Sequence, residues 1–162
     1  MTRALTVIAA AALALTGCFV PQTLWPQSDA EAGPGVPEGT PAVLVGSRAS
    51  DYKLALVQAI SDSLAKDGVY VELVGIDDLD ERDVNDYVAV VVVSTCIAWG
   101  HDADVRGFLS DNPDDHGRMI LVTTSGDGEW MPGDDREYDA VSSASEINQL
   151  DEVSAQVAAM IR

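Results

Sequence analysis

The chain has 162 residues, 47% of them hydrophobic, which is enough for one domain of ordinary size with its own core. Its 27 acidic and 9 basic residues give a formal net charge of −18 at pH 7, and the acidic excess is spread along the chain. Such a chain repels phosphate backbones and anionic lipid surfaces, so the charge argues against nucleic acid as a partner.

The first 17 residues have the pattern of a secretory signal peptide. The apolar run from Ala4 to Leu15 is shorter than the roughly 20 residues that a membrane-spanning helix needs. It ends in Leu15-Thr16-Gly17-Cys18, which resembles the lipobox of bacterial lipoproteins. That resemblance implies cleavage before Cys18, acylation of Cys18 with fatty acids such as palmitate, and anchoring of the chain to a membrane on its extracytoplasmic side. An ordinary cleaved signal, or an anchor with a chance cysteine, is the alternative.

Residues 18–41 are expected to be the lipidated cysteine followed by a tether. Five prolines and three glycines lie between residues 19 and 41, too many for a helix or a strand. We therefore expect this segment to pack against nothing, and one folded domain to occupy residues 42–162.

From residue 42 on, strand and helix patterns alternate. The apolar run Ala42–Val45 predicts a strand buried on both faces, and Asp51–Asp67 predicts a helix that ends at Gly68. Val69–Val74 alternates like an edge strand. The polar segment Asp77–Asp86 is expected to hold at most a short helix.

The second half of the chain continues this alternation. Val88–Val93 is the most apolar run and predicts a central strand, and Met119–Thr123 and Tyr138–Val141 predict two further strands. A short helix, with Val105, Phe108 and Leu109 on one face, is expected between the third and fourth strands. Ser125–Glu137 contains too many glycines for a helix and is expected to be a long loop.

The chain is expected to end in a helix with a capping box formed by Ser143 and Glu146. Its inward-facing residues would be Ile147, Leu150, Val153, Val157 and Ile161. The whole pattern predicts an α/β fold with a doubly wound, five-stranded parallel sheet of order 2-1-3-4-5.

Three loops follow the carboxyl ends of the predicted strands, where such sheets bind their ligands. They are Gly46–Asp51, Ser94–His101 and Thr123–Trp130. Stacking on Trp99 and Trp130, with a phosphate at the start of the first helix, would suit a flat aromatic ligand with a phosphate tail. His101 and His116 have no second histidine or cysteine at ligand spacing, so no metal site is predicted.

These loops resemble those of the flavodoxin-like family in three places. They are the Gly46-Ser47 turn, Ser94-Thr95 with Trp99-Gly100, and the Thr-Ser-Gly-Asp-Gly run from Thr124. The resemblance, which covers roughly residues 42–162, implies non-covalent FMN, electron transfer and a redox partner protein. Carried over by position, the phosphate would be held by Ser47 and Ser50, with Arg48 as a further donor. The ring would lie against Thr95, Trp99, Gly100, Ser125, Gly126, Asp127 and Trp130.

The first loop departs from the family's phosphate-binding pattern, Ser/Thr-x-Thr-Gly-x-Thr. Ala49 and Tyr52 replace two of its hydroxyl residues, and Asp51 adds a negative charge. Two functions therefore remain open: an FMN-dependent electron-transfer module, or an accessory or interaction module that has lost FMN. A third pattern, Asp139–Ser145, is similar to segments that receive covalent FMN, but the predicted capping box already accounts for its serines.

We predict that Cys18 is the lipidated residue. Metabolic labelling with a radioactive fatty acid should label the native chain and leave the Cys18→Ser variant unlabelled, because the thiol is the acceptor. Equal labelling of the two proteins would contradict this prediction.

Overall fold

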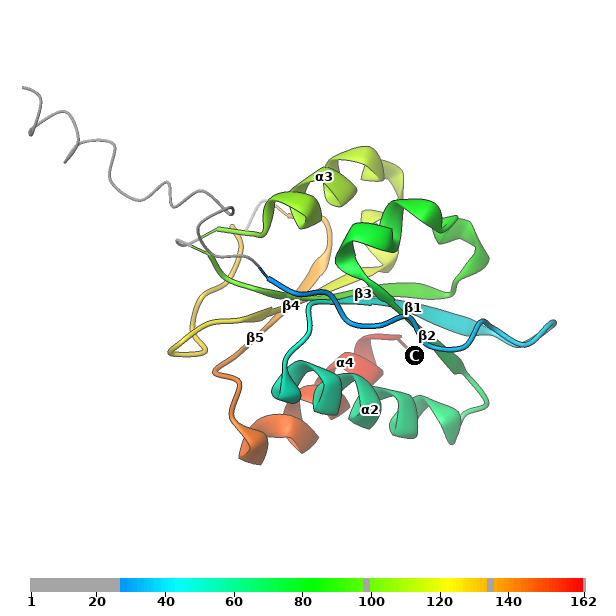
Figure 1. Cartoon of the computed structure of the whole chain (residues 1–162), viewed down its shortest axis with the longest axis horizontal. Coiled ribbons are helices and arrows are strands. Elements are labelled where there is room, and N and C mark those ends of the chain that lie inside the picture. The colour runs from blue at the N-terminus through cyan, green and yellow to red at the C-terminus, as the bar shows by residue number, and fades with distance from the viewer. Residues whose placement is uncertain (1–26, 98–99, 134–135, 162) are drawn as a thin grey trace, which may run out of the picture.

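The computed structural model describes residues 27–97, 100–133 and 136–161, so the predictions for the signal peptide, Cys18 and Trp99 lie outside the described residues. The described chain forms one five-stranded sheet of order β2-β1-β3-β4-β5, with every neighbouring pair parallel and helices on both faces (Figure 1). This is the predicted α/β fold with the flavodoxin-like strand order. No helix among the described residues has the length and apolar character needed to cross a membrane.

All five strands lie where the sequence predicted them, with ends that differ by one or two residues. They are β1 (Ala42–Ser47), β2 (Tyr70–Gly75), β3 (Ala89–Thr95), β4 (Met119–Thr124) and β5 (Asp139–Ser143). β3 lies in the middle of the sheet, and Val90 and Val91 within it are fully buried. β2 is an edge strand, as its alternating pattern indicated.

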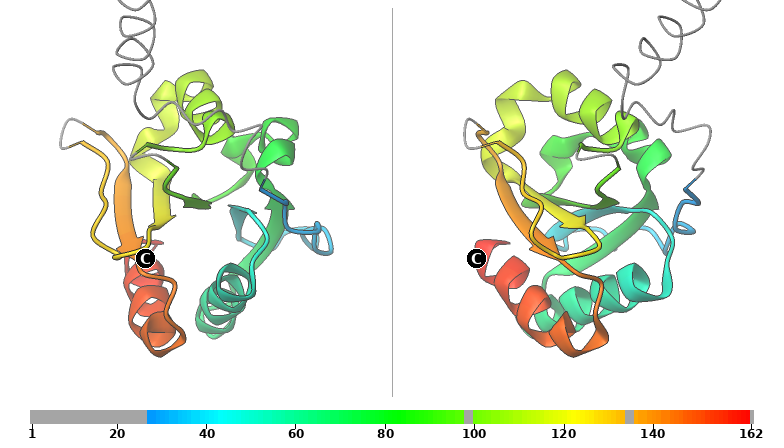
Figure 2. Two further views of the ribbon diagram at one scale, coloured as in Figure 1. Left: turned by 60° about the vertical axis from the view of Figure 1, so that its left-hand side comes forward. Right: turned by 90° about the vertical axis from the view of Figure 1, so that its left-hand side faces the viewer.

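The two faces of the sheet are covered differently (Figure 2). One face packs against α2 (Asp51–Ala65) and α4 (Leu150–Ile161), which also contact each other. The other packs against α3 (Ala103–Asp111) and the short 3-10 helices η2 (Ile76–Glu81) and η3 (Val84–Asp86). We call this second side the α3 face.

The connection between β4 and β5 contains no helix among its described residues. The glycine-rich stretch was predicted to be a loop, and its described residues do form a loop. Because β4 and β5 are parallel, this loop has to lead the chain back from the end of β4 to the start of β5. A crossover of this kind usually includes a helix that packs on the sheet. Beyond α3 and the short helix η4 (Pro113–Arg118), the α3 face of these two strands is therefore covered mainly by loop residues.

The predicted capping box at the last helix is wrong. Ser143 belongs to β5, where it pairs with Thr124, and its hydroxyl lies 2.6 Å from the Tyr52 hydroxyl. Glu146 precedes the 3-10 turn η5 (Ile147–Gln149) without a side-chain capping bond, and α4 begins only at Leu150. Ile147, predicted to face inward, is 65% exposed because it lies on this turn rather than on the helix. The other four predicted inward residues of the helix do pack on the core.

The prediction that residues 19–41 pack against nothing is wrong for their described part. Ala30 is buried, its amide donates to the Ser47 carbonyl (3.0 Å), and the Ala49 amide donates to the Ser28 carbonyl (2.6 Å). The Gly33 amide donates to the Leu73 carbonyl on β2 (2.8 Å). The physical reason is that β2 is an edge strand, whose unpaired backbone groups can hydrogen-bond to a passing segment. We call residues 27–33 the docked segment.

We predict that the Val91→Asp variant does not fold, because it places an unpaired charge in the middle of the sheet at a cost of several kcal/mol. The matched control is Val88→Asp, just outside β3, where the side chain is 53% exposed. Urea unfolding followed by circular dichroism should show a cooperative transition for the control only. A cooperative transition for Val91→Asp would show that β3 is not the central strand.

Candidate functional site

The side chain of Arg48 lies at the carboxyl end of β1, inside a group of four aspartates. Its Nε and Nη2 donate to the two carboxylate oxygens of Asp102 at 2.9 and 3.2 Å. The remaining bonds run from Nη1 to Asp29 (2.5 Å) and Asp77 (2.8 Å), and from Nη2 to Asp104 (2.5 Å). We call these five residues the Arg48 cluster. It joins the docked segment, η2 and the start of α3 to the end of β1.

Burial and charge explain the ionisation of this cluster. The Arg48 side chain is 3% exposed, and burial alone would lower its pKa, but the hydrogen bonds that it donates to Asp102 and Asp77 raise the pKa overall. Partial burial raises the pKa of Asp104, although its hydrogen bond to Arg48 acts in the opposite direction. With one guanidinium among four carboxylates, the cluster has an excess of negative charge.

The residues predicted to hold a phosphate are hydrogen-bonded to other groups of the protein. Arg48, predicted to be a phosphate donor, is committed to the four carboxylates. Ser47 is fully buried and its hydroxyl donates to the Arg48 carbonyl (2.9 Å). Ser50 caps α2 by accepting the amide of Lys53 (3.2 Å). The backbone amides of Arg48 and Ala49 donate to Val93 and Ser28 carbonyls.

Thr95, predicted to face a flavin ring, is bonded to Lys53. The Nζ of Lys53 donates to Thr95 Oγ1 at 2.7 Å, and this hydroxyl lies 3.2 Å from Gln27 Oε1 in the docked segment. Burial lowers the pKa of Lys53, and the charge of Arg48 lowers it further. The sequence analysis missed Lys53, because a lysine in the first turn of a helix is usually solvated.

The loop after β4 forms a turn of its own at the surface. The Asp127 carboxylate accepts the Glu129 amide (3.1 Å) and the Ser125 hydroxyl (2.9 Å), and these bonds lower the pKa of Asp127. Gly128 has a φ of +71°, and a Cβ there would lie 2.6 Å from the Ala144 amide nitrogen, so this position requires glycine. Gly126 is exposed. Of these loop residues, none lines the cavity described next.

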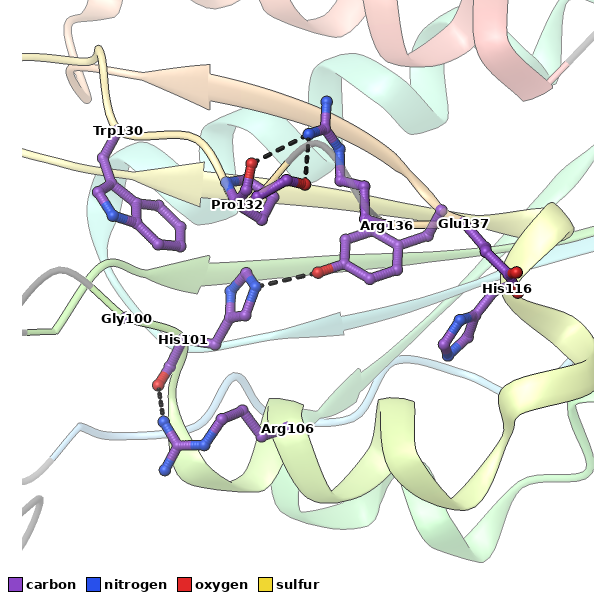
Figure 3. Close-up of a pocket in the computed structure, with 10 residues that line it drawn as sticks. Gly100, His101, Arg106, His116, Trp130, Pro132, Arg136 and Glu137 are labelled. Atoms are coloured by element: carbon purple, nitrogen blue, oxygen red, sulfur yellow. Dashed lines mark hydrogen bonds between the residues drawn. The ribbon is translucent and has the colours of Figure 1, made fainter.

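A cavity of about 520 Å³ lies on the α3 face, between α3 and the loop that joins β4 to β5 (Figure 3). It is lined by Gly100, His101, Arg106, His116, Trp130, Pro132, Gly133, Arg136, Glu137 and Tyr138. Two of the predicted ring-binding residues, Gly100 and Trp130, are therefore part of one hollow.

Aromatic contacts hold the walls of this cavity. His101 Nε2 and the Tyr138 hydroxyl are 3.1 Å apart, and the Trp130 ring meets the His101 ring edge to face with centroids 5.1 Å apart. His116 meets Tyr138 in the same way at 5.6 Å. Burial lowers the pKa of His101, and the charge of Arg106 lowers it further.

Two arginines fix the loops around the cavity. Arg106 on α3 donates to the His101 carbonyl (2.6 Å), and Arg136 donates to the carbonyls of Pro132 (3.0 Å) and Gly133 (2.9 Å). The sequence analysis missed both arginines, both histidines and Tyr138. The signal that could have found them was the predicted lack of a helix between β4 and β5, since a missing layer leaves space on the sheet.

No protein-family model matches the chain, and no curated protein matches its sequence. Among solved structures, it is similar to a mutant flavodoxin from Pseudomonas aeruginosa, with 17% identity and a TM-score of 0.49 over 74% of this chain and 97% of the flavodoxin. It is also similar to a metal-soaked flavodiiron core from Synechocystis, with 10% identity and a TM-score of 0.46 over 76% of this chain and 36% of that one. These likenesses concern the fold alone.

The described residues at the carboxyl edge do not fit the phosphate of FMN. A flavin phosphate needs free hydrogen-bond donors after β1, whereas the Ala49 amide is bonded to the docked segment and the Arg48 side chain to four carboxylates. The excess negative charge of the Arg48 cluster would also repel a phosphate. Among the described residues there is likewise no group of three or more histidines, cysteines, aspartates or glutamates placed to bind a metal ion.

We predict that Arg48→Met destabilises the protein by about 3–5 kcal/mol at pH 7, because it leaves the buried carboxylate of Asp102 without a counter-charge. The matched control is Arg118→Met, which removes an ion pair with Asp115 whose arginine side chain is 37% exposed. The control should lose at most about 1 kcal/mol. Urea unfolding of the full chain measures both values, and a loss of similar size in the two variants would contradict the prediction.

The loss of unfolding free energy caused by Arg48→Met should also become smaller as the pH falls from 7 towards about 4. Without Arg48, the clustered carboxylates repel one another with no cation among them, so protonation relieves this repulsion and stabilises the folded variant on acidification. Unfolding free energies of variant and wild type, measured across this pH range, should converge. A difference that stays constant with pH would contradict this assignment of charge.

Proposed function

We propose that this chain is an accessory or interaction module with a flavodoxin-like fold, anchored by lipid to the extracytoplasmic side of a membrane, which works without FMN. The observation that supports it best is the engagement of Arg48. The Arg48 side chain, predicted to receive a phosphate, is instead the centre of an internal ion-pair cluster. The adjacent backbone amide, that of Ala49, donates to the Ser28 carbonyl of the docked segment.

The docked segment also bears on how the anchor would hold the domain. Gln27, the first described residue, lies nine positions after Cys18, and a fully extended chain spans at most about 3.3–3.6 Å per residue. A lipid on Cys18 would thus keep the carboxyl edge of the sheet within roughly 30 Å of the membrane. The proposed module therefore works close to the membrane surface.

The partner of such a module would be a neighbouring envelope protein or a small ligand. A charge of −18 disfavours direct contact with anionic lipid, so the membrane contact would be made by the anchor alone. The alternative function, electron transfer to a redox partner protein, requires FMN. A titration of the protein with FMN therefore distinguishes the two functions.

We predict that the full chain, purified in mild detergent, does not bind FMN up to high micromolar concentrations. Each missing hydrogen bond to a charged group costs about 1.5–3 kcal/mol, and the first loop lacks at least two. Quenching of flavin and tryptophan fluorescence measures binding, with an apo-flavodoxin as positive control. Saturable binding of one FMN per chain would overturn the proposal in favour of electron transfer.

A further inference from the structure

The cavity on the α3 face exists because one layer of the fold is missing there. β4 and β5 are joined by a loop, so no crossover helix fills the space beside α3. In Figure 3 the cavity runs along these strands, from His116 at one end to Trp130 and His101 at the end where the strands terminate. Its volume of about 520 Å³ lies within the range of small-molecule sites, roughly 300–1,000 Å³.

The charge of this cavity differs from that of the rest of the chain. Two of the nine basic residues, Arg106 and Arg136, line it, and Glu137 is the single acidic residue among the lining side chains that the structure describes. The Arg106 guanidinium donates to a neutral backbone carbonyl, which does not cancel its charge. Figure 3 shows this guanidinium next to His101, at the same end of the cavity as Trp130.

A row of buried hydroxyls lies on the same face of the sheet at the same end. Ser94 on β3 pairs with Thr123 on β4, which pairs with Ser142 on β5, so the three side chains are neighbours across the strands. Ser94 and Thr123 are fully buried. Their hydroxyls, that of Ser142 and the Nδ1 of His101 have no hydrogen-bond partner among the described residues.

Buried polar groups in folded proteins almost always have a partner, which is a protein group, an ordered water or a ligand. Of these four atoms, the Nδ1 of His101 belongs to a residue that lines the cavity, and it indicates that a polar group belongs there. An imidazole and a guanidinium can both donate hydrogen bonds, and together they suit a group rich in acceptor oxygens.

We propose that this cavity binds a small aromatic carboxylate, with its ring against Trp130 and its carboxylate towards Arg106 and His101. The inference deepens the proposed function, since it assigns a ligand class to a module that works without FMN. A monoanion suits the site better than a phosphate dianion, because the Arg48 cluster lies on the same face and the whole chain is strongly acidic.

The test uses 2-naphthoate as the probe and the full chain in mild detergent, with binding measured by isothermal titration calorimetry. One naphthoate per chain should bind, and neutral 2-naphthamide should bind at least tenfold more weakly because it lacks the charge. Arg106→Gln should weaken naphthoate binding at least tenfold, and Trp130→Ala should also weaken it. The matched control is Arg82→Gln. It removes a cation that is bonded to Glu72 on β2 and does not line the cavity, so it should leave the affinity for naphthoate unchanged.

Absence of saturable naphthoate binding by the folded wild-type protein would overturn the inference. So would equal affinities for wild type and Arg106→Gln, with circular dichroism confirming that both are folded. Titration of FMN into the naphthoate-saturated protein keeps the two proposals apart. Stoichiometric FMN binding without displacement of naphthoate would overturn the proposed function and leave the cavity assignment standing.

Discussion

The carboxyl edge of this sheet is organised by the buried guanidinium of Arg48. An arginine that is 3% exposed needs every donor satisfied, and here the acceptors come from four aspartates on three separate segments. Asp29 ties the docked segment to the domain, Asp77 ties the 3-10 helix after β2, and Asp102 and Asp104 tie the start of α3.

This arrangement also determines what the edge can bind. Asp102 caps α3 through the Asp104 amide while it holds Arg48, so the adjacent residue, His101, is fixed at the mouth of the cavity. The ion pairs and the docked segment close the site beside β1 where a mononucleotide phosphate would lie. The missing helix between β4 and β5 opens another site on the α3 face. The proposed binding surface therefore lies beside the fourth and fifth strands rather than beside the first.

The sequence predicted the fold well because strand burial depends on local apolar runs. Val88–Val93 indicated a central strand and Ser125–Glu137 indicated a long loop, and both are found. The site was predicted less well because it depends on contacts between distant residues. Nothing near Arg48 indicates that Asp29 and Asp102 converge on it, and a proline- and glycine-rich stretch gives no sign that it will dock on an edge strand. His101 and His116, separated by a helix, likewise come to contact the same Tyr138 ring only in the folded chain.

The most direct test of this account is the hydrogen exchange of individual backbone amides in the full chain, followed by nuclear magnetic resonance. The central claim is that the docked segment closes the loop after β1, which requires the Ala49 amide to donate to Ser28 and the Gly33 amide to Leu73. The account predicts that both amides exchange slowly compared with the exposed amide of Gly35. Exchange of Ala49 and Gly33 at the rate of an unstructured chain would contradict it.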